Sequence, residues 1–320
     1  MRTNRWLLAF AACCIALGVS KLRADPVHPR APAVTVSQSD SYLLQSKVTG
    51  RKYRISVALP LGPPARASVV YLLDADELFG LATDTARLLQ DSGEIPPVLV
   101  VGIGYPIHSF DEAMVPRSRD FTPVTDGPYE QLVRELRGGK CCVPTGGAKD
   151  FLEFIRGELK PFIAGHYSVD PGDSTVIGHS LGGLFALYAL LQEPGTFQRY
   201  VVGSPCLICG NRFLFNRESG YAAAHADLAA RVYMDVGTEE ADLRKILDVP
   251  PDMHDAERRY LEATGNPDSV EVFRQFVSAL QGRHYASLQL RSAVESAEGH
   301  ESLPPILVSR GLRAVYSGTR

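Results

Sequence analysis

The sequence contains little tryptophan, little methionine and no strong excess of either charge. Its 320 residues include one tryptophan and four methionines, and 33 Lys and Arg residues stand against 36 Asp and Glu residues. This mixed, slightly acidic charge gives no indication of an extended basic surface for nucleic acid. Internal repeats and low-complexity tracts are also absent. A hydrophobic share of 45% and a charged share of 22% indicate a globular protein with one large domain or two small ones.

The first 24 residues differ from the rest of the chain. Arg2 and Arg5 precede an apolar core at residues 6–19, and small residues between Ser20 and Ala24 offer cleavage points. This pattern predicts an export signal, and the core is short for a membrane span. An uncleaved N-terminal anchor is the alternative. Residues 25–40 are rich in proline and predict a linker, which leaves residues 41–320 as a single catalytic domain.

Outside the predicted signal, four cysteines remain: Cys141, Cys142, Cys206 and Cys209. An even number of cysteines in an exported protein favours disulfides over free thiols. Four cysteines allow three pairings, and a bridge between the adjacent Cys141 and Cys142 would be strained. We therefore expect one or two bridges between the 141–142 loop and the 206–209 loop. Zinc is disfavoured, because the CxxC spacing occurs only once.

Short apolar segments alternate with helical patterns along the domain. Strands are predicted at residues 53–60, 68–74, 97–104, 174–178, 199–205, 231–237 and 285–290, and helices at 150–163, after Ser180, at 269–281 and from Pro304. Residues 241–267 are polar and predict a helical excursion near the active-site end. Continuous apolar strands separated by helices indicate one α/β domain with a mainly parallel sheet.

The motif Gly178-His179-Ser180-Leu181-Gly182 lies between a predicted strand and a predicted helix. A nucleophilic serine on such a sharp turn needs small neighbours, because larger side chains would crowd the backbone. The turn presents the hydroxyl at the edge of the sheet, near the N-terminus of the next helix. Ser180 is therefore the predicted nucleophile, and a structural turn with an idle serine is the alternative.

The general base is predicted from chain order. In α/β-hydrolases the acid and then the histidine follow the nucleophile, so the four histidines before Ser180 are excluded. His300 follows the last predicted strand and precedes the terminal helix, whereas His284 precedes that strand. His300 is the predicted base, with His284 as the weaker candidate.

The acid should follow a strand between Ser180 and the base. Glu239 and Glu240 follow the strand that ends at Gly237, and we favour Glu240, with Glu239 as the alternative. A solvated pair at a helix N-terminus is the structural alternative. For the oxyanion hole, the backbone amide of Leu181 and an amide at Ala75 or Asp76 are predicted.

The chain resembles the putative-esterase family of α/β-hydrolases, which includes siderophore esterases and esterase D (S-formylglutathione hydrolase). The resemblance runs from about Tyr42 to Tyr316 and is most similar to the siderophore-esterase branch. It is carried by the segments "VVYLLDAD", "RSRDFTP", "GGAKDFLEFIRGELKPFI", "IGHSLGGLFALYALL", "VGTEE" and "GHESLPPILVSRGLR".

The resemblance implies an α/β-hydrolase fold, and "VGTEE" aligns with a Gly-x-x-Glu that favours Glu240. It implies a substrate-binding arginine in "RSRDFTP", at Arg119 or Arg117. Pairing of Arg119 with Asp120 or Glu112 is the structural alternative. His179 is a further candidate for substrate contact. The segment "SPCLICGNRF" replaces an aromatic-rich family segment, so an aromatic platform for catechol rings is not expected.

These residues predict an exported serine esterase that hydrolyses carboxylic esters through an acyl-enzyme on Ser180. Siderophore-type and short-acyl esters are the candidate substrates, and no metal or organic cofactor is required. An acyltransferase with the same triad and a catalytically silent hydrolase-like binding protein are the alternatives. The expected partner is a small-molecule ester rather than nucleic acid. Membrane contact is expected only through an uncleaved signal.

Overall fold

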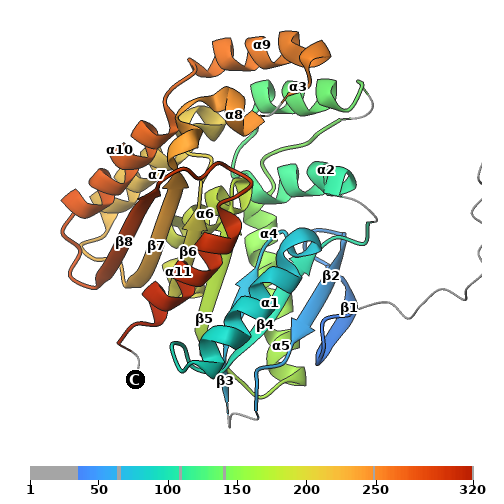
Figure 1. The fold of residues 1–320 in the computed structure, drawn as a ribbon, viewed down its shortest axis with the longest axis vertical. Coiled ribbons are helices and arrows are strands. Elements are labelled where there is room, and N and C mark those ends of the chain that lie inside the picture. Colours follow the sequence, from blue (N-terminus) through green and yellow to red (C-terminus); the bar gives the residue numbers. More distant parts are fainter. Residues whose placement is uncertain (1–34, 63–65, 108–109, 140–141, 248, 319–320) are drawn as a thin grey trace, which may run out of the picture. The chain divides into compact units, whose positions relative to one another are not determined.

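An eight-stranded sheet forms the centre of the domain in the computed structural model (Figure 1). The model describes residues 35–62, 66–107, 110–139, 142–247 and 249–318. The predicted signal at 1–24, most of the predicted linker and Cys141 lie outside these residues. The compact unit extends over Val36–Arg320. Its first strand begins at Ser39.

The strands follow the order β1-β2-β4-β3-β5-β6-β7-β8 across the sheet. Only the pairs β1–β2 and β2–β4 are antiparallel, and every other neighbouring pair is parallel. The strands are β1 Ser39–Gln45, β2 Lys52–Ala58, β3 Ala67–Leu72, β4 Val98–Gly104, β5 Val169–His179, β6 Arg199–Gly203, β7 Ala230–Gly237 and β8 Leu288–Glu295. This mainly parallel sheet confirms the predicted fold class.

Helices cover both faces of the sheet, which explains the continuous apolar strands. All residues of Val98–Gly104 in β4 and of Ala67–Leu72 in β3 are buried. The helices are α1 Ala75–Asp91, α2 Phe110–Phe121, α3 Gly127–Leu136, α4 Ala148–Phe154, α5 Lys160–His166, α6 Leu181–Gln192, α7 Cys209–Ala224, α8 Leu243–Leu247, α9 His254–Thr264, α10 Ser269–Gly282 and α11 Pro304–Tyr316. A π-helical turn, Ile155–Leu159, joins α4 to α5.

Two apolar cores lie on opposite faces of the sheet. On one face, α1 and α11 pack together over β4 and β6, with Leu307, Leu312 and Val201 fully or almost fully buried (Figure 1). The opposite face is covered by helices that include α4, α6 and α10, whose apolar side chains form the larger core. Among the described residues, no helix is both long enough and apolar enough to cross a bilayer.

The excursion predicted at residues 241–267 is helical and contains α8 and α9. Helix α9 contacts both α3 and α8. These three helices lie beyond the ends of β7 and β8 at which the arrows point (Figure 1). Ligands of open α/β sheets bind outside the carboxyl ends of the strands, so this end of the sheet is the expected place for a site.

The predicted disulfide between two loops is wrong. Cys206 and Cys209 are bridged to each other, with 5.5 Å between their Cα atoms, and Cys142 is a free, exposed thiol. The CxxC turn at the start of α7 already brings the two Cα atoms within the range that a disulfide spans. A local turn therefore supplies the geometry, and no contact with a distant loop is needed.

Candidate active site

Ser180 lies in the turn between β5 and α6, with backbone angles φ 60° and ψ −120°. A non-glycine residue is strained at these angles, and such strain is typical of a functional position. Two glycines permit the turn. A Cβ atom at Gly178 would lie 2.2 Å from the Gly182 carbonyl oxygen, and one at Gly183 would lie 2.9 Å from that of Gly203. The Ser180 amide donates to the Gly203 carbonyl at 2.9 Å, which ties the turn to β6.

His300 and Glu240 form a close pair beside this turn. His300 Nδ1 lies 2.6 Å from Glu240 Oε2, and 10% and 2% of the two side chains are exposed. The carboxylate also accepts hydrogen bonds from the Ser204 hydroxyl at 2.5 Å and the Gly237 amide at 2.8 Å. Since Nδ1 faces the carboxylate, Nε2 is the His300 nitrogen that remains for proton transfer.

The alternative residues for these roles lie elsewhere. The Glu239 side chain is half exposed and forms an ion pair with Lys245 on the surface. His284 is exposed at the start of the segment that leads to β8. Ser180, His300 and Glu240, in contrast, line one cavity of about 430 Å³. The structure thus brings together the favoured residues and separates them from Glu239 and His284.

The amides predicted for the oxyanion hole are at two helix N-termini. Leu184 is the first residue of α6 whose amide bonds back to the Ser180 carbonyl, at 3.0 Å, so the Leu181 amide has no intrahelical acceptor. In α1, the first amide that bonds back along the helix is that of Glu77, which donates to the Asp74 carbonyl at 3.1 Å. The amides of Ala75 and Asp76 therefore also have no intrahelical acceptor. Asp74 lines the cavity. The Asp76 carboxylate instead accepts from the Tyr105 amide at 2.7 Å and pairs with Arg54.

Of the two candidate arginines, Arg117 lines the cavity. Its guanidinium donates two hydrogen bonds of 2.9 Å to the carboxylate of Asp74, and both side chains are buried. Arg119 lies 3.6 Å from Asp120 and 3.8 Å from Asp150, and its side chain packs beside Gly147. The contacts of Arg119 are those of the structural alternative, in which it holds a loop.

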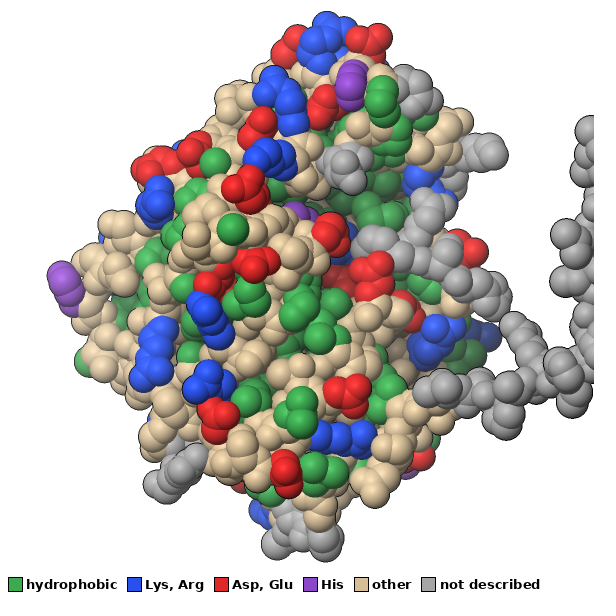
Figure 2. Space-filling view, in the orientation of Figure 1, with side chains coloured by type: hydrophobic (Ala, Val, Ile, Leu, Met, Phe, Trp, Pro, Cys, Tyr) green, Lys and Arg blue, Asp and Glu red, His purple; other side chains and the backbone are tan. Residues whose placement is uncertain are grey.

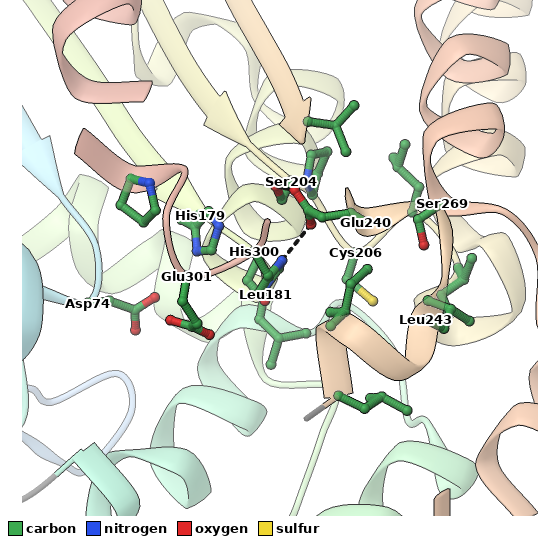
Figure 3. A pocket seen from close by; sticks show the side chains of 18 of the residues that line it. Asp74, His179, Leu181, Ser204, Cys206, Glu240, Leu243, Ser269, His300 and Glu301 are labelled. Carbon is green, nitrogen blue, oxygen red and sulfur yellow. Dashed lines mark hydrogen bonds and ion pairs between the residues drawn. The ribbon is translucent and has the colours of Figure 1, made fainter. Parts of the chain in front are cut away.

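His179 lies in the cavity against His300, with 4.4 Å between the ring centroids (Figure 3). Burial, and then the neighbouring His300 and Arg117, lowers the pKa of His179 well below its usual value. His179 is therefore neutral at neutral pH. A neutral ring beside His300 adds no positive charge that would oppose the imidazolium formed during proton transfer.

Sequence reasoning missed two residues of this site. Ser204 donates to Glu240, and Asp74 holds Arg117. Asp235 does not line the cavity: it is fully buried in β7, where burial and then the Glu295 charge raise its pKa to about 8. Ser204 directly follows β6, the strand next to the Ser180 turn, and this position is the only signal in the sequence that could have indicated it. The contact between Asp74 and Arg117 joins segments far apart in the chain, so no local pattern indicates it.

The sheet order and the strained serine turn define the chain as an α/β-hydrolase. A family model described as "Putative esterase" matches residues 46–286, and the chain belongs to this family. The predicted family resemblance is thus confirmed, and the protein is a hydrolase of ester bonds.

Named relatives extend over most of the chain. The ferri-bacillibactin esterase BesA of Bacillus subtilis is 32% identical over 289 residues, which are 88% of this chain and 90% of the relative. The siderophore triacetylfusarinine C esterase of Aspergillus fumigatus is 26% identical and covers 90% of this chain and 96% of its own. The solved structure of the siderophore hydrolase EstA from Aspergillus nidulans superposes with a TM-score of 0.70 at 25% identity, and covers 89% of this chain and 97% of its own.

Proposed function

We propose that the protein is an exported serine esterase that cleaves small-molecule carboxylic esters through an acyl-enzyme on Ser180. The observation that carries this proposal is the buried Glu240–His300 pair in the same cavity as the strained Ser180 turn. A hydrogen-bonded acid and base in the same cavity as a nucleophile is the arrangement that acyl transfer needs.

In the first step, Ser180 Oγ attacks the ester carbonyl while His300 Nε2 removes the hydroxyl proton. The Glu240 carboxylate holds the imidazole and stabilises its positive charge. The amide of Leu181, with that of Ala75 or Asp76, stabilises the oxyanion. His300 then protonates the leaving alcohol as the C–O bond breaks. Water attacks the acyl-enzyme with the same proton transfers, releases the acid and restores Ser180.

The names of the relatives favour siderophore-type esters among the candidate substrates. BesA is named for ferri-bacillibactin and the Aspergillus fumigatus relative for triacetylfusarinine C. Short-acyl esters are the other candidate class. Export is proposed from the N-terminal pattern of Arg2, Arg5 and the apolar core at 6–19 alone.

Labelling with a fluorophosphonate probe tests the nucleophile. The wild type should be labelled and should release acid from 4-nitrophenyl acetate, and Ser180→Ala should lose both reactions. Failure of the wild type to react, or equal labelling of Ser180→Ala, contradicts the proposal and favours a catalytically silent protein.

Two histidine variants form a matched pair for the base. His300→Ala should lose hydrolysis, whereas His284→Ala, at an exposed position outside the cavity, should keep it. The reverse result contradicts the assignment of His300. If a competing alcohol is acylated in preference to water, the protein is an acyltransferase.

A further inference from the structure

The cavity around Ser180 has two sides of different chemistry. Figure 3 shows Asp74 and Glu301 on one side of His300, and Cys206 and Leu243 on the other. The first side is acidic and the second is mostly apolar. Because an ester has an acyl arm and an alcohol arm on either side of the reacting carbonyl, the two sides constrain the two arms separately.

The apolar side is formed by the helices beyond the carboxyl end of the sheet. Three helices supply most of its side chains: α3 provides Leu132 and Val133, α8 provides Leu243, Ile246 and Leu247, and α10 provides Phe273. Leu207 and Ile208, which precede α7, complete it. Leu81 also lines the cavity, but from α1, the helix that carries Glu77. Burying an apolar group of the substrate here is favourable by about 25 cal/mol per Å² of surface removed from water.

The acidic side carries more carboxylates than the lysine and arginine side chains of the described residues in the cavity can balance. Glu77 and Glu301 line it, together with the Asp74–Arg117 pair. Arg117 is the only lysine or arginine among the described residues that line the cavity, and Asp74 engages it through two hydrogen bonds. Glu240 adds a fourth carboxylate deeper in the site, against His300.

The behaviour of Glu77 agrees with a negative environment. Glu77 is exposed, yet partial burial, and then the charges of Asp74 and Glu301, raises the pKa of its carboxyl. Figure 2 shows acidic side chains along one rim of a hollow in which hydrophobic side chains are visible. A negative charge on a bound substrate would be repelled by the same carboxylates. On the apolar side, such a charge would also lose its hydration.

We propose that this esterase selects esters with one apolar arm and no negative charge on either arm, and discriminates against anionic esters. The inference rests on the proposed function, since it describes the substrate of the same site. Among siderophore-type esters it favours uncharged ones over polyanionic ones. The observations that support this inference are the apolar side chains on one side of the cavity and the excess of carboxylates on the other.

Esters of matched length that differ only in their end group test this selectivity. In the acyl series, 4-nitrophenyl hexanoate is compared with the 4-nitrophenyl esters of adipic acid and 6-aminohexanoic acid. In the alcohol series, hexyl acetate is compared with 6-acetoxyhexanoate and 6-acetoxyhexylammonium. We expect kcat/KM to be roughly tenfold or more lower for the carboxylate than for the methyl end in at least one series. The ammonium ester should fall between them.

Variants on α1 provide matched controls. Glu77→Gln should raise kcat/KM of the carboxylate ester relative to its methyl counterpart, whereas Asp84→Asn, seven residues further along on an exposed position, should leave this ratio unchanged. Leu243→Ala, on the apolar side, should lower kcat/KM for the hexanoyl ester roughly fivefold more than for the acetyl ester. Leu88→Ala, at a position on α1 that is 72% exposed, should not.

Two outcomes would overturn the inference: equal or faster cleavage of the carboxylate esters in both series, or an unchanged selectivity ratio in Glu77→Gln. Fluorophosphonate labelling in the same preparations separates this failure from failure of the proposed function. A preparation that is labelled at Ser180 and cleaves esters without charge selectivity contradicts only the inference. An unlabelled wild type contradicts the proposed function itself.

Discussion

Replacing Glu240 by glutamine should leave the fold intact and place the wrong tautomer on His300. The Glu240 carboxylate accepts three hydrogen bonds, from Ser204, Gly237 and His300. A glutamine of the same shape has only one oxygen. The Ser204 hydroxyl and the Gly237 amide both reach Oε1, so the amide oxygen of glutamine is best placed there. Its NH₂ group then faces His300.

The consequence for His300 follows from this orientation. An NH₂ group beside Nδ1 requires Nδ1 to accept, which moves the imidazole proton to Nε2. A protonated Nε2 cannot remove the proton of Ser180. The loss of the correct tautomer and of the carboxylate charge should lower kcat about 10⁴-fold, which corresponds to about 5.5 kcal/mol in the activation free energy.

Hydrolysis of 4-nitrophenyl acetate measures this loss, and thermal unfolding followed by circular dichroism checks that the variant folds. Glu239→Gln is the matched control, because Glu239 is the adjacent residue and its side chain is half exposed in a surface ion pair. That control should keep kcat within about twofold, as surface pairs contribute little. The reasoning is refuted if folded Glu240→Gln keeps more than a tenth of wild-type kcat, or if Glu239→Gln loses as much.

Three further predictions concern stability. The pKa of Asp235 is raised to about 8 in the folded chain. Between about pH 4 and pH 8 the folded chain therefore keeps a proton on this carboxyl that the unfolded chain releases. The free energy of unfolding falls as pH rises through that window. The advantage of Asp235→Asn in urea unfolding should therefore grow by up to about 1.4 kcal/mol per pH unit from pH 5 to pH 7. Gly178→Ala would place Cβ 2.2 Å from a backbone oxygen and should cost roughly 3 kcal/mol in urea unfolding, whereas Gly220→Ala, with open space around its Cβ, should be neutral or stabilising. Replacing both Cys206 and Cys209 by serine opens a short loop and should lower the free energy of unfolding by about 2 kcal/mol.

Each of these predictions has a contradicting result. A pH-independent difference between wild type and Asp235→Asn would show that this carboxyl does not titrate in the window. Equal stability of the Gly178→Ala and Gly220→Ala variants would contradict the explanation that the Ser180 turn needs a glycine at position 178 for steric reasons. If the wild type under reducing conditions unfolds at the same urea concentration as when oxidised, the Cys206–Cys209 bridge contributes nothing to stability.

The fold class followed from the sequence because buried parallel strands and amphipathic helices have distinct hydrophobic periods. Runs such as residues 98–104 are apolar at every position, and the structure buries all of them. Strand β1, which the sequence did not indicate, has a weaker pattern. The burial of β1 alternates irregularly at the edge of the sheet.

The order of chemistry-bearing residues along the chain also followed from the sequence. The glycine spacing around Ser180 marks a turn that only small neighbours allow, and the position of His300 after the last strand is a matter of chain order. Both are local or sequential properties. The preference for Glu240 over Glu239 gained its main support from the family resemblance, because two adjacent acids are nearly equivalent in a one-dimensional pattern.

Only the tertiary structure decided how these groups are held and what surrounds them. Glu240 faces His300 because the turn after β7 directs it inward, while Glu239 points to solvent. The Asp74–Arg117 pair spans segments far apart in the chain, and the bridge between Cys206 and Cys209 replaced the expected long-range one. The charge and polarity of the cavity arise from α1, α3, α8 and α10 together. Such contacts depend on which faces of the helices and strands pack against each other. A sequence pattern shows which face of an element is apolar, but not which other element that face contacts.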